Sequence, residues 1–178
     1  VYALMHAGAD ASDATLYVTL EPCSHYGKTP PCARSVAKAG LKRVVIAMRD
    51  PNPLVAGQGI AYLQAQGIEV IVGVLEREAR ELNVGYISQM DRGRPWVRCK
   101  LAMSLDGRTA LSSGESKWIT GESARGDVQR LRARSCAIVT GVGTIEHDNP
   151  SMNVRHDQMA VDFNHYASPI PPLRVILD

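Results

Sequence analysis

Short apolar runs and helix-like segments alternate through the first half of the chain. Three runs rich in β-branched residues have the length and composition of strands. They occupy residues 16–20, 42–48 and 68–74. A segment predicted as a helix follows each strand, at residues 31–40, 59–67 and 76–90. Pro31 opens the first helix and Gly40 closes it, the usual asymmetry of helix ends. This alternation predicts an α/β unit with a largely parallel sheet.

A polar stretch with Gly and Pro, residues 91–95, separates this unit from a second one. We therefore predict two domains, residues 1–91 and residues 95–178. In the second domain the pattern predicts three strands, one helix and one loop. These are strands at 96–104, 136–141 and 173–178, a helix at 122–133 and a loop at 156–172.

Two local signals refine the second domain. Thr120 precedes the predicted helix closely enough to serve as its N-cap. Asp106 and Gly107 form a strong turn signal after the first predicted strand.

Length, composition and charge are those of a soluble globular protein. Of its 178 residues 45% are hydrophobic and 21% are charged, which argues against disorder. No apolar run approaches the roughly 18–20 residues needed to cross a bilayer. A formal net charge of +2 without a basic run gives no electrostatic reason to expect nucleic acid binding. We expect a cytoplasmic protein that binds neither membrane nor nucleic acid, with no disulfide framework among its four cysteines.

Both ends of the sequence interrupt a predicted element. Val1 lies inside a segment with a helical pattern, and residues 173–178 form a predicted strand that nothing follows. Because natural domains seldom begin inside a helix and stop on a strand, we expect this sequence to be part of a longer chain.

The segment EPCSHYGKTPPC, residues 21–32, carries the most specific chemistry. Cys23 follows a predicted strand, and Cys32 begins a predicted helix, where free N–H groups and the helix dipole stabilise a thiolate. Thiolates bind Zn²⁺ well, and a catalytic zinc site has three protein ligands and a water. The spacing alone leaves two interpretations open, a metal site or two incidental cysteines in a Pro-rich loop. His25 could be a ligand, a substrate contact or a loop residue, and His6 fits an ordinary helix surface.

The order strand, E-P-C, loop, P-C, helix resembles the zinc-dependent cytidine deaminase superfamily. The long cysteine loop followed by DPNP, residues 50–53, is similar to one branch of it, the bifunctional deaminase–reductases of riboflavin biosynthesis. The resemblance implies that Cys23 and Cys32 are zinc ligands. It also implies a His-Ala-Glu motif just before Val1, with a third ligand and the glutamate that moves protons. Neither residue is present, so the sequence holds no catalytic residue of the deaminase, and we expect these 178 residues alone to be inactive.

Three motifs of the second half resemble the reductase domain of the same family, which has a dihydrofolate reductase-like fold. They are KLAMSLDGRTAL, GESKWIT and DNPSMNVR, in the order expected of one bifunctional enzyme. The resemblance implies NADPH as hydride donor, with a later cofactor loop that this sequence lacks. The implied cofactor contacts are Ala102, Trp118, Thr144 and Asp148. The implied substrate contacts are Ser116, Arg132, Met152 and Arg155.

Residue by residue, these positions also have ordinary interpretations. A single arginine is more often a solvated surface charge, although arginines suit a sugar phosphate by charge and fork geometry. A lone tryptophan is more often a core residue than a cofactor platform, and the turn Gly141-x-Gly143 is too short for a dinucleotide fingerprint. Cys99 and Cys136, on predicted strands, fit buried packing positions.

The resemblance covers essentially the whole sequence. It implies a cytidine deaminase-like α/β/α domain without its start, then a dihydrofolate reductase-like α/β domain without its end. The implied reactions act on a small phosphoribosyl aminopyrimidine: hydrolytic loss of an amino group at zinc, then reduction of the ribosyl group to a ribityl chain.

Two alternatives stay open. One is a nucleoside or nucleic-acid base deaminase, against which the C-x₈-C spacing and the near-neutral charge argue. The other is a non-catalytic binding module with a degenerate site. Self-association, common among relatives, is also left open.

Overall fold

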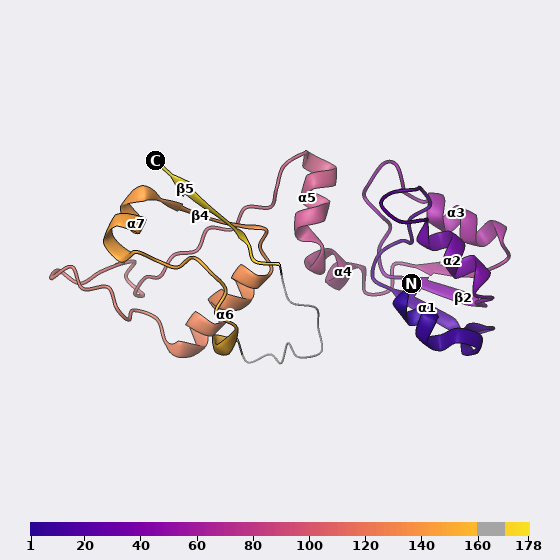
Figure 1. The fold of residues 1–178 in the computed structure, drawn as a ribbon, viewed down its shortest axis with the longest axis horizontal. Helices are drawn as coiled ribbons and strands as arrows, with labels where there is room; N and C mark the ends of the chain where they lie inside the picture. The colour runs from indigo at the N-terminus through magenta and orange to yellow at the C-terminus, as the bar shows by residue number, and fades with distance from the viewer. Residues whose placement is uncertain (160–169) are drawn as a thin grey trace. The chain divides into compact units, whose positions relative to one another are not determined.

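The chain forms two compact units, Val1–Arg98 and Cys99–Asp178. The structure is a computed structural model, and it describes residues 1–159 and 170–178 (Figure 1). The predicted domain limits, 1–91 and 95–178, stay a prediction. No helix in the described ranges is long and apolar enough to cross a membrane.

The first unit has a parallel sheet of three strands flanked by helices (Figure 1). Its strands are β1 (Thr15–Val18), β2 (Arg43–Ile46) and β3 (Glu69–Val72), in the order β1-β2-β3. Its helices are α1 (Tyr2–Ala7), the 3₁₀ turn η1 (Gly8–Ala11), α2 (Cys32–Lys38) and α3 (Gln58–Ala65). All three predicted strands and the helices between them are confirmed, as is the parallel sheet.

Alternation along the strands places one face of this sheet in the core. Leu16, Val44 and Val70 are neighbours in register and belong to one hydrophobic cluster. Ala33 and Val36 of α2, Leu63 of α3 and Ala11 of η1 complete the buried side of that cluster. On the opposite face Tyr17 of β1 is 73% exposed. The helices therefore pack on the face that carries the even-numbered strand residues, as a period of two requires.

The predicted helix at residues 76–90 is divided in two. The structure has α4 (Glu76–Leu82) and α5 (Val84–Arg92), with Asn83 between them at φ −111° and ψ 18°. The Asn83 side chain donates to the Ala79 carbonyl oxygen at 2.8 Å. A short amide side chain that bonds the preceding turn competes with the helical backbone pattern, which explains the break.

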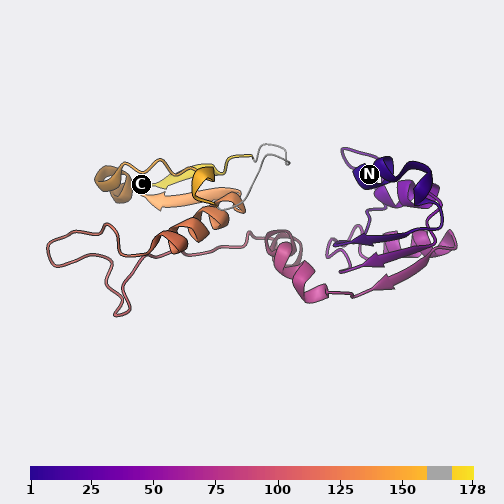
Figure 2. The same ribbon diagram turned by 90° about the horizontal axis from the view of Figure 1, so that it is seen from below.

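The second unit contains two parallel strands, β4 (Ala137–Gly141) and β5 (Leu173–Leu177). Its helices are α6 (Glu122–Ala133), α7 (Val142–Asp148) and the 3₁₀ turn η2 (His156–Gln158). In Figure 2 the two strands run side by side, with α7 directly at the end of β4. The predicted helix and both of these strands are confirmed, whereas α7 was not predicted.

The N-cap of α6 is Gly121 and not Thr120. The Gly121 carbonyl oxygen accepts the first helical bond, from the Arg125 N–H at 3.1 Å. The Thr120 carbonyl oxygen instead accepts a bond from the Arg125 guanidinium at 2.6 Å. A backbone contact of Thr120 thus replaces the predicted side-chain cap.

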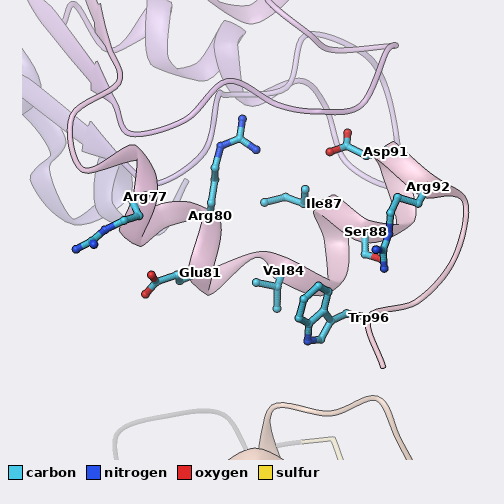
Figure 3. A pocket seen from close by; sticks show the side chains of 9 residues that line it. All are labelled: Arg77, Arg80, Glu81, Val84, Ile87, Ser88, Asp91, Arg92 and Trp96. Atoms are coloured by element: carbon cyan, nitrogen blue, oxygen red, sulfur yellow. The ribbon is translucent and has the colours of Figure 1, made fainter. Parts of the chain in front are cut away.

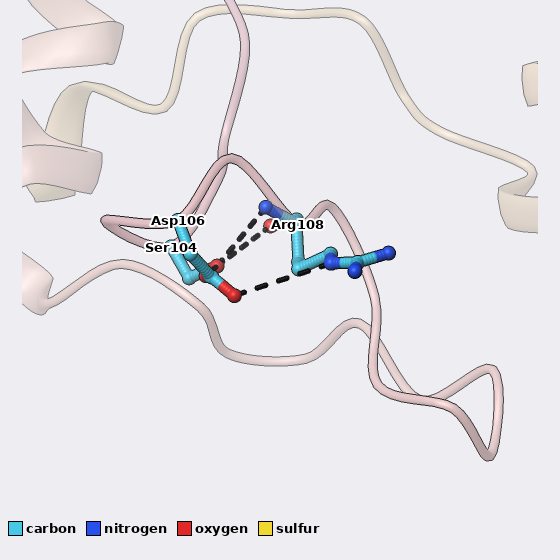
Figure 4. Close-up of polar contacts among 3 residues, drawn as sticks. All are labelled: Ser104, Asp106 and Arg108. Carbon is cyan, nitrogen blue, oxygen red and sulfur yellow. Dashed lines mark hydrogen bonds and ion pairs between the residues drawn. The ribbon is translucent and has the colours of Figure 1, made fainter.

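The predicted strand at residues 96–104 is wrong, because these residues form no ladder with any described strand. The turn after it is present, although no described pair of strands flanks it as in a hairpin: Gly107 has φ +82° and donates its N–H to the Ser104 carbonyl oxygen at 2.9 Å. Ser104 Oγ also accepts from the Arg108 N–H at 3.1 Å, and Asp106 faces both residues (Figure 4).

Cys99 and Cys136 are exposed, so the prediction that they are buried is also wrong. Cys99 lies on the segment that joins no sheet, and Cys136 precedes a sheet of two strands. In the predicted loop, residues 156–158 form η2, and residues 160–169 lie outside the described ranges.

Gly59 on α3 allows the closest backbone approach in the first unit. A Cβ added there would lie 2.0 Å from the Pro22 carbonyl oxygen, whereas one added at Gly85 of α5 would meet nothing within 4 Å. We expect Gly59→Ala to lower the free energy of unfolding by about 2–3 kcal/mol, since backbone has to move. The matched control Gly85→Ala should gain about 0.5–1 kcal/mol from helix propensity. Urea unfolding checks both, and equal effects would contradict the close approach.

Candidate functional site

Cys23 and Cys32 come together at the start of α2. The Cys32 N–H donates to Cys23 Sγ at 3.3 Å, and the Ala33 N–H donates to the Cys23 carbonyl oxygen at 3.1 Å. The loop between the cysteines therefore closes on the first turn of the helix. The sequence predicted Cys32 at a helix start and Cys23 after a strand, and the structure brings Cys23 Sγ to that helix start.

The Cys32 thiol is affected by its surroundings and by Cys23. The pKa of Cys32 is raised by partial burial first, and then by the hydrogen bond and the charge of Cys23. Two thiolates at such short range repel, and a cation between them removes that repulsion. Neighbouring thiol sulfurs on a loop and a helix start are a donor set that fits Zn²⁺.

A complete ligand set is not formed. Among the residues that the structure describes, no three His, Cys, Asp or Glu side chains converge as a metal site requires. His25 is exposed, as is His6 on α1. Ser24 Oγ, next to Cys23, is buried without a hydrogen-bond partner in the described ranges. The two cysteine sulfurs are fewer donors than the three protein ligands that a catalytic zinc site has.

Glu21, two residues before Cys23, anchors this segment. Its carboxylate is 3% exposed and accepts three backbone N–H bonds, from Asp50 at 3.2 Å, Gly57 at 3.0 Å and Ile60 at 3.1 Å. A buried carboxylate with three donors is well satisfied, and removing it would leave those donors unpaired. The sequence analysis missed this role; the only signal was an acidic residue directly after an apolar strand.

Asp50 begins the DPNP segment, residues 50–53, and is also buried. Asp50 Oδ1 accepts the Asn52 N–H at 2.8 Å, which closes an Asx turn, and the Tyr86 hydroxyl of α5 at 2.8 Å. Burial raises the pKa of Tyr86 to about 12, with further contributions from the hydrogen bond and the charge of Asp50. The phenol is therefore a protonated donor at neutral pH.

Ser116 and Trp118 line one cavity of about 290 Å³ in the second unit. Trp118 is 68% exposed, and the Arg125 guanidinium of α6 stacks over its ring at 4.6 Å. An exposed ring held by a cation is open for further stacking on its other face. The remaining lining residues are Ser104, Arg108, Ala110, Leu111, Glu115, Lys117 and Ile119.

Arg132 and Arg155 come together elsewhere in this unit. The pKa of Arg132 is lowered, first by partial burial and then by the charge of Arg155. Arg132 donates to the Asn153 carbonyl oxygen at 2.9 Å, and the Arg155 N–H donates to Gln129 Oε1 at 3.0 Å. Met152, with φ +49°, is buried and directly precedes Asn153. The structure thus places two arginines where each influences the charge of the same region.

The other predicted cofactor contacts lie outside that cavity lining. Ala102 lies on the segment without sheet pairing. Thr144 and Asp148 are four residues apart on α7, so they share one helix face, and both are exposed. The structure thus brings Ser116 to Trp118 and Arg132 to Arg155, and it does not join Ala102, Thr144 and Asp148 to the Trp118 cavity.

A further cavity of about 380 Å³ lies on α4, α5 and Trp96 (Figure 3). The Arg92 guanidinium lies 5.8 Å from the Trp96 ring centre and donates to Ser88 Oγ at 3.1 Å. None of the predicted site residues lines this cavity.

Comparison with known proteins accounts for both units. Residues 1–81 match the MafB19-like deaminase family, and residues 95–178 match the RibD C-terminal domain. The riboflavin biosynthesis protein RibD of Haemophilus influenzae is 51% identical over 179 residues, which cover 99% of this chain and 48% of that protein. The Escherichia coli RibD is 48% identical over 181 residues, covering 100% of this chain and 49% of that protein.

Solved structures agree. Acinetobacter baumannii RibD has a TM-score of 0.83 at 51% identity, covering 98% of this chain and 48% of that one. A Thermotoga maritima structure, named as a diaminohydroxyphosphoribosylaminopyrimidine deaminase/5-amino-6-(5-phosphoribosylamino)uracil reductase, has the same TM-score at 41% identity, with the same coverage. The chain spans about half the length of the curated relatives it matches.

The fold and these matches define a deaminase domain joined to a dihydrofolate reductase-like domain, which confirms the predicted fold class. The chain belongs to the RibD family of riboflavin biosynthesis. Domains of these two kinds imply a metal and a nucleotide cofactor in general. The assignment of ligands and contacts to single residues stays a prediction.

The raised pKa of Tyr86 makes the free energy of unfolding depend on pH. Because the pKa rises from 10.0 to about 12, the protonated phenol stabilises the folded state fully below pH 10 and progressively less between pH 10 and 12. We expect Tyr86→Phe to lose about 1–2 kcal/mol of unfolding free energy at pH 8, with the deficit shrinking above pH 10. Urea unfolding from pH 8 to 11 checks this, with exposed Tyr17→Phe as the control; a deficit that stays constant to pH 11 would contradict it.

Proposed function

We propose that the first unit is the zinc-dependent deaminase of a bifunctional riboflavin-biosynthesis enzyme, and that the second is its NADPH-dependent reductase. The substrate is a phosphoribosyl aminopyrimidine, as the names of the relatives indicate. The observation that carries the proposal is the hydrogen bond that brings Cys23 Sγ to the Cys32 N–H, in a chain about 50% identical to RibD proteins.

In the first unit, Cys23 and Cys32 would hold the zinc ion as thiolates. Zinc, when bound, lowers the pKa of a water molecule so that hydroxide is available near neutral pH. The role of this chain's residues is to fix the two sulfurs: Glu21 holds the segment before Cys23, and α2 orients Cys32. The family resemblance adds a His and a Glu before Val1 as third ligand and proton carrier. A carboxylate at that point delivers protons to the ring nitrogen and to the departing ammonia.

In the second unit, the Arg132–Arg155 pair would bind the substrate phosphate. Two guanidiniums supply the charge and the fork geometry that a phosphate dianion needs. Ser116, at the Trp118 cavity, and Met152 would contact the same substrate. Partial burial and then the charge of Arg155 lower the pKa of Arg132, and a bound anion would offset the repulsion between the two arginines.

The cofactor of this reaction would lie against Trp118. The indole gives a flat apolar surface for a nicotinamide ring, and Arg125 holds that surface from one side. Ala102, Thr144 and Asp148 would provide further cofactor contacts, as the resemblance implies. When bound, the cofactor would supply the hydride that reduces the ribosyl group to a ribityl chain.

The metal assignment is tested in the protein expressed from its complete gene. We expect about one zinc per chain by metal analysis and a loss of at least tenfold in zinc affinity for Cys23→Ala and for Cys32→Ala. Cys99→Ala, which removes an exposed thiol, is the matched control and should keep the wild-type zinc content. Zinc retained by both site variants would remove the metal assignment, and well below one zinc in the wild type would favour a non-catalytic module. Faster deamination of free cytidine than of the phosphoribosyl pyrimidine would favour a nucleoside deaminase.

The reductase assignment is tested by NADPH oxidation with the deaminated substrate. Loss of a charge-assisted hydrogen bond to phosphate corresponds to about a tenfold or larger rise in KM for Arg132→Gln. Arg130→Gln is the control, because Arg130 is on the same helix and pairs with Asp127 at the surface. Equal KM values for the two variants would argue against phosphate binding by Arg132.

A further inference from the structure

A chain of hydrogen bonds runs from α5 to the cysteine segment. The Tyr86 hydroxyl donates to Asp50 Oδ1 at 2.8 Å, and the Asp50 N–H donates to Glu21 Oε2 at 3.2 Å. Glu21 is joined to Cys23 by Pro22, whose ring fixes its own φ. Only two hydrogen bonds and one rigid residue thus separate the α5 phenol from a proposed zinc ligand.

The turn at Asp50, which links Tyr86 to Glu21, is held in one conformation by several contacts. Asp50 is 6% exposed, and its Oδ1 is shared between Tyr86 and the Asn52 N–H. The same Glu21 carboxylate takes the N–H groups of Gly57 and Ile60. Gly59, between those two, lies against the Pro22 carbonyl oxygen, where a Cβ would come within 2.0 Å. The segment before Cys23 therefore follows any displacement of the turn.

Tyr86 belongs to α5, which follows the residues matched by the deaminase family model, 1–81. Its bond to Asp50 connects this helix with the turn after β2. The apolar positions of α5 do not require a hydrogen bond between Tyr86 and Asp50, because apolar packing can dock a helix without one.

We propose that Tyr86 is a positioning residue of the deaminase site: its hydroxyl fixes the Asp50 turn, and the turn fixes Cys23 through Glu21. The proposal rests on the proposed deaminase function. Residues that hold metal ligands in place without binding the metal orient those ligands, and their loss commonly lowers activity or metal affinity about 10–100-fold.

The first experiment compares Tyr86→Phe with wild type in the zinc-loaded protein expressed from its complete gene. We expect kcat for deamination to fall about tenfold, with KM changed by less than about twofold, because substrate contacts are retained while the metal ligand shifts. Tyr17→Phe, an exposed tyrosine on β1 of the same unit, is the matched control and should keep the wild-type kcat. All assays are run well below the melting temperatures of the variants.

A second variant separates the hydroxyl from the ring. Tyr86→His keeps a ring N–H donor and should recover a substantial part of kcat relative to Tyr86→Phe. A Tyr86→Phe enzyme with the kcat of the control, or a Tyr86→His enzyme no better than Tyr86→Phe, would overturn the proposal.

A readout independent of turnover uses Co²⁺ added to the metal-free protein. Cobalt held by thiolates absorbs visible light, and the spectrum reports the arrangement of its ligands. We expect an altered spectrum or at least tenfold weaker Co²⁺ binding in Tyr86→Phe, and neither in Tyr17→Phe. Identical cobalt spectra and Co²⁺ affinities in the wild type and in Tyr86→Phe would overturn the positioning role, whether or not the wild type deaminates. Failure of the wild type to deaminate would count against the proposed function.

Discussion

The buried carboxylate of Glu21 is the interaction on which the first unit depends. A carboxylate removed from water destabilises a fold unless hydrogen bonds replace its solvation. Here three backbone N–H groups do so, and all three come from residues 50–60. The turn after β2, the start of α3 and the segment before Cys23 therefore behave as one body. The position of the cysteine pair follows from this arrangement, since the segment has little regular structure of its own.

The helices and strands that could be predicted from the sequence are those that local sequence pattern determines. The three strands of the first unit were readable because each is a short apolar run rich in β-branched residues, and the structure shows that their even-numbered residues face one core. Helices α2 and α6 were readable from their spacing and end signals. The break at Asn83 could not be read from the sequence, because a side-chain bond to the Ala79 carbonyl interrupts a segment whose composition is helical throughout. The strand at 96–104 failed for another reason: a β-rich sequence forms a strand only where a ladder partner exists.

The candidate site residues also fall into two groups, those that the sequence could place together and those that only the structure could. The order of strand, loop and helix start was enough to bring Cys23 and Cys32 together, because both lie close to element ends. Tyr86 and Asp50 could not be paired from the sequence, since 36 residues separate them and neither stands in a recognisable spacing. The electrostatic interaction of Arg132 on α6 with Arg155, just before η2, likewise needed the structure. Tertiary hydrogen bonds of this kind leave almost no trace in a single sequence.

The two units each hold groups that can take the same charge near one another, with different consequences. In the first, partial burial and the neighbouring Cys23 raise the pKa of Cys32, so without a metal the pair favours neutral thiols. A metal ion that binds thiolates would therefore displace their protons, and its affinity would rise with pH. In the second, partial burial and the charge of Arg155 lower the pKa of Arg132, but arginine stays protonated at neutral pH. An anion at the arginines would thus meet charges that are already present, whereas a cation at the cysteines would have to create them.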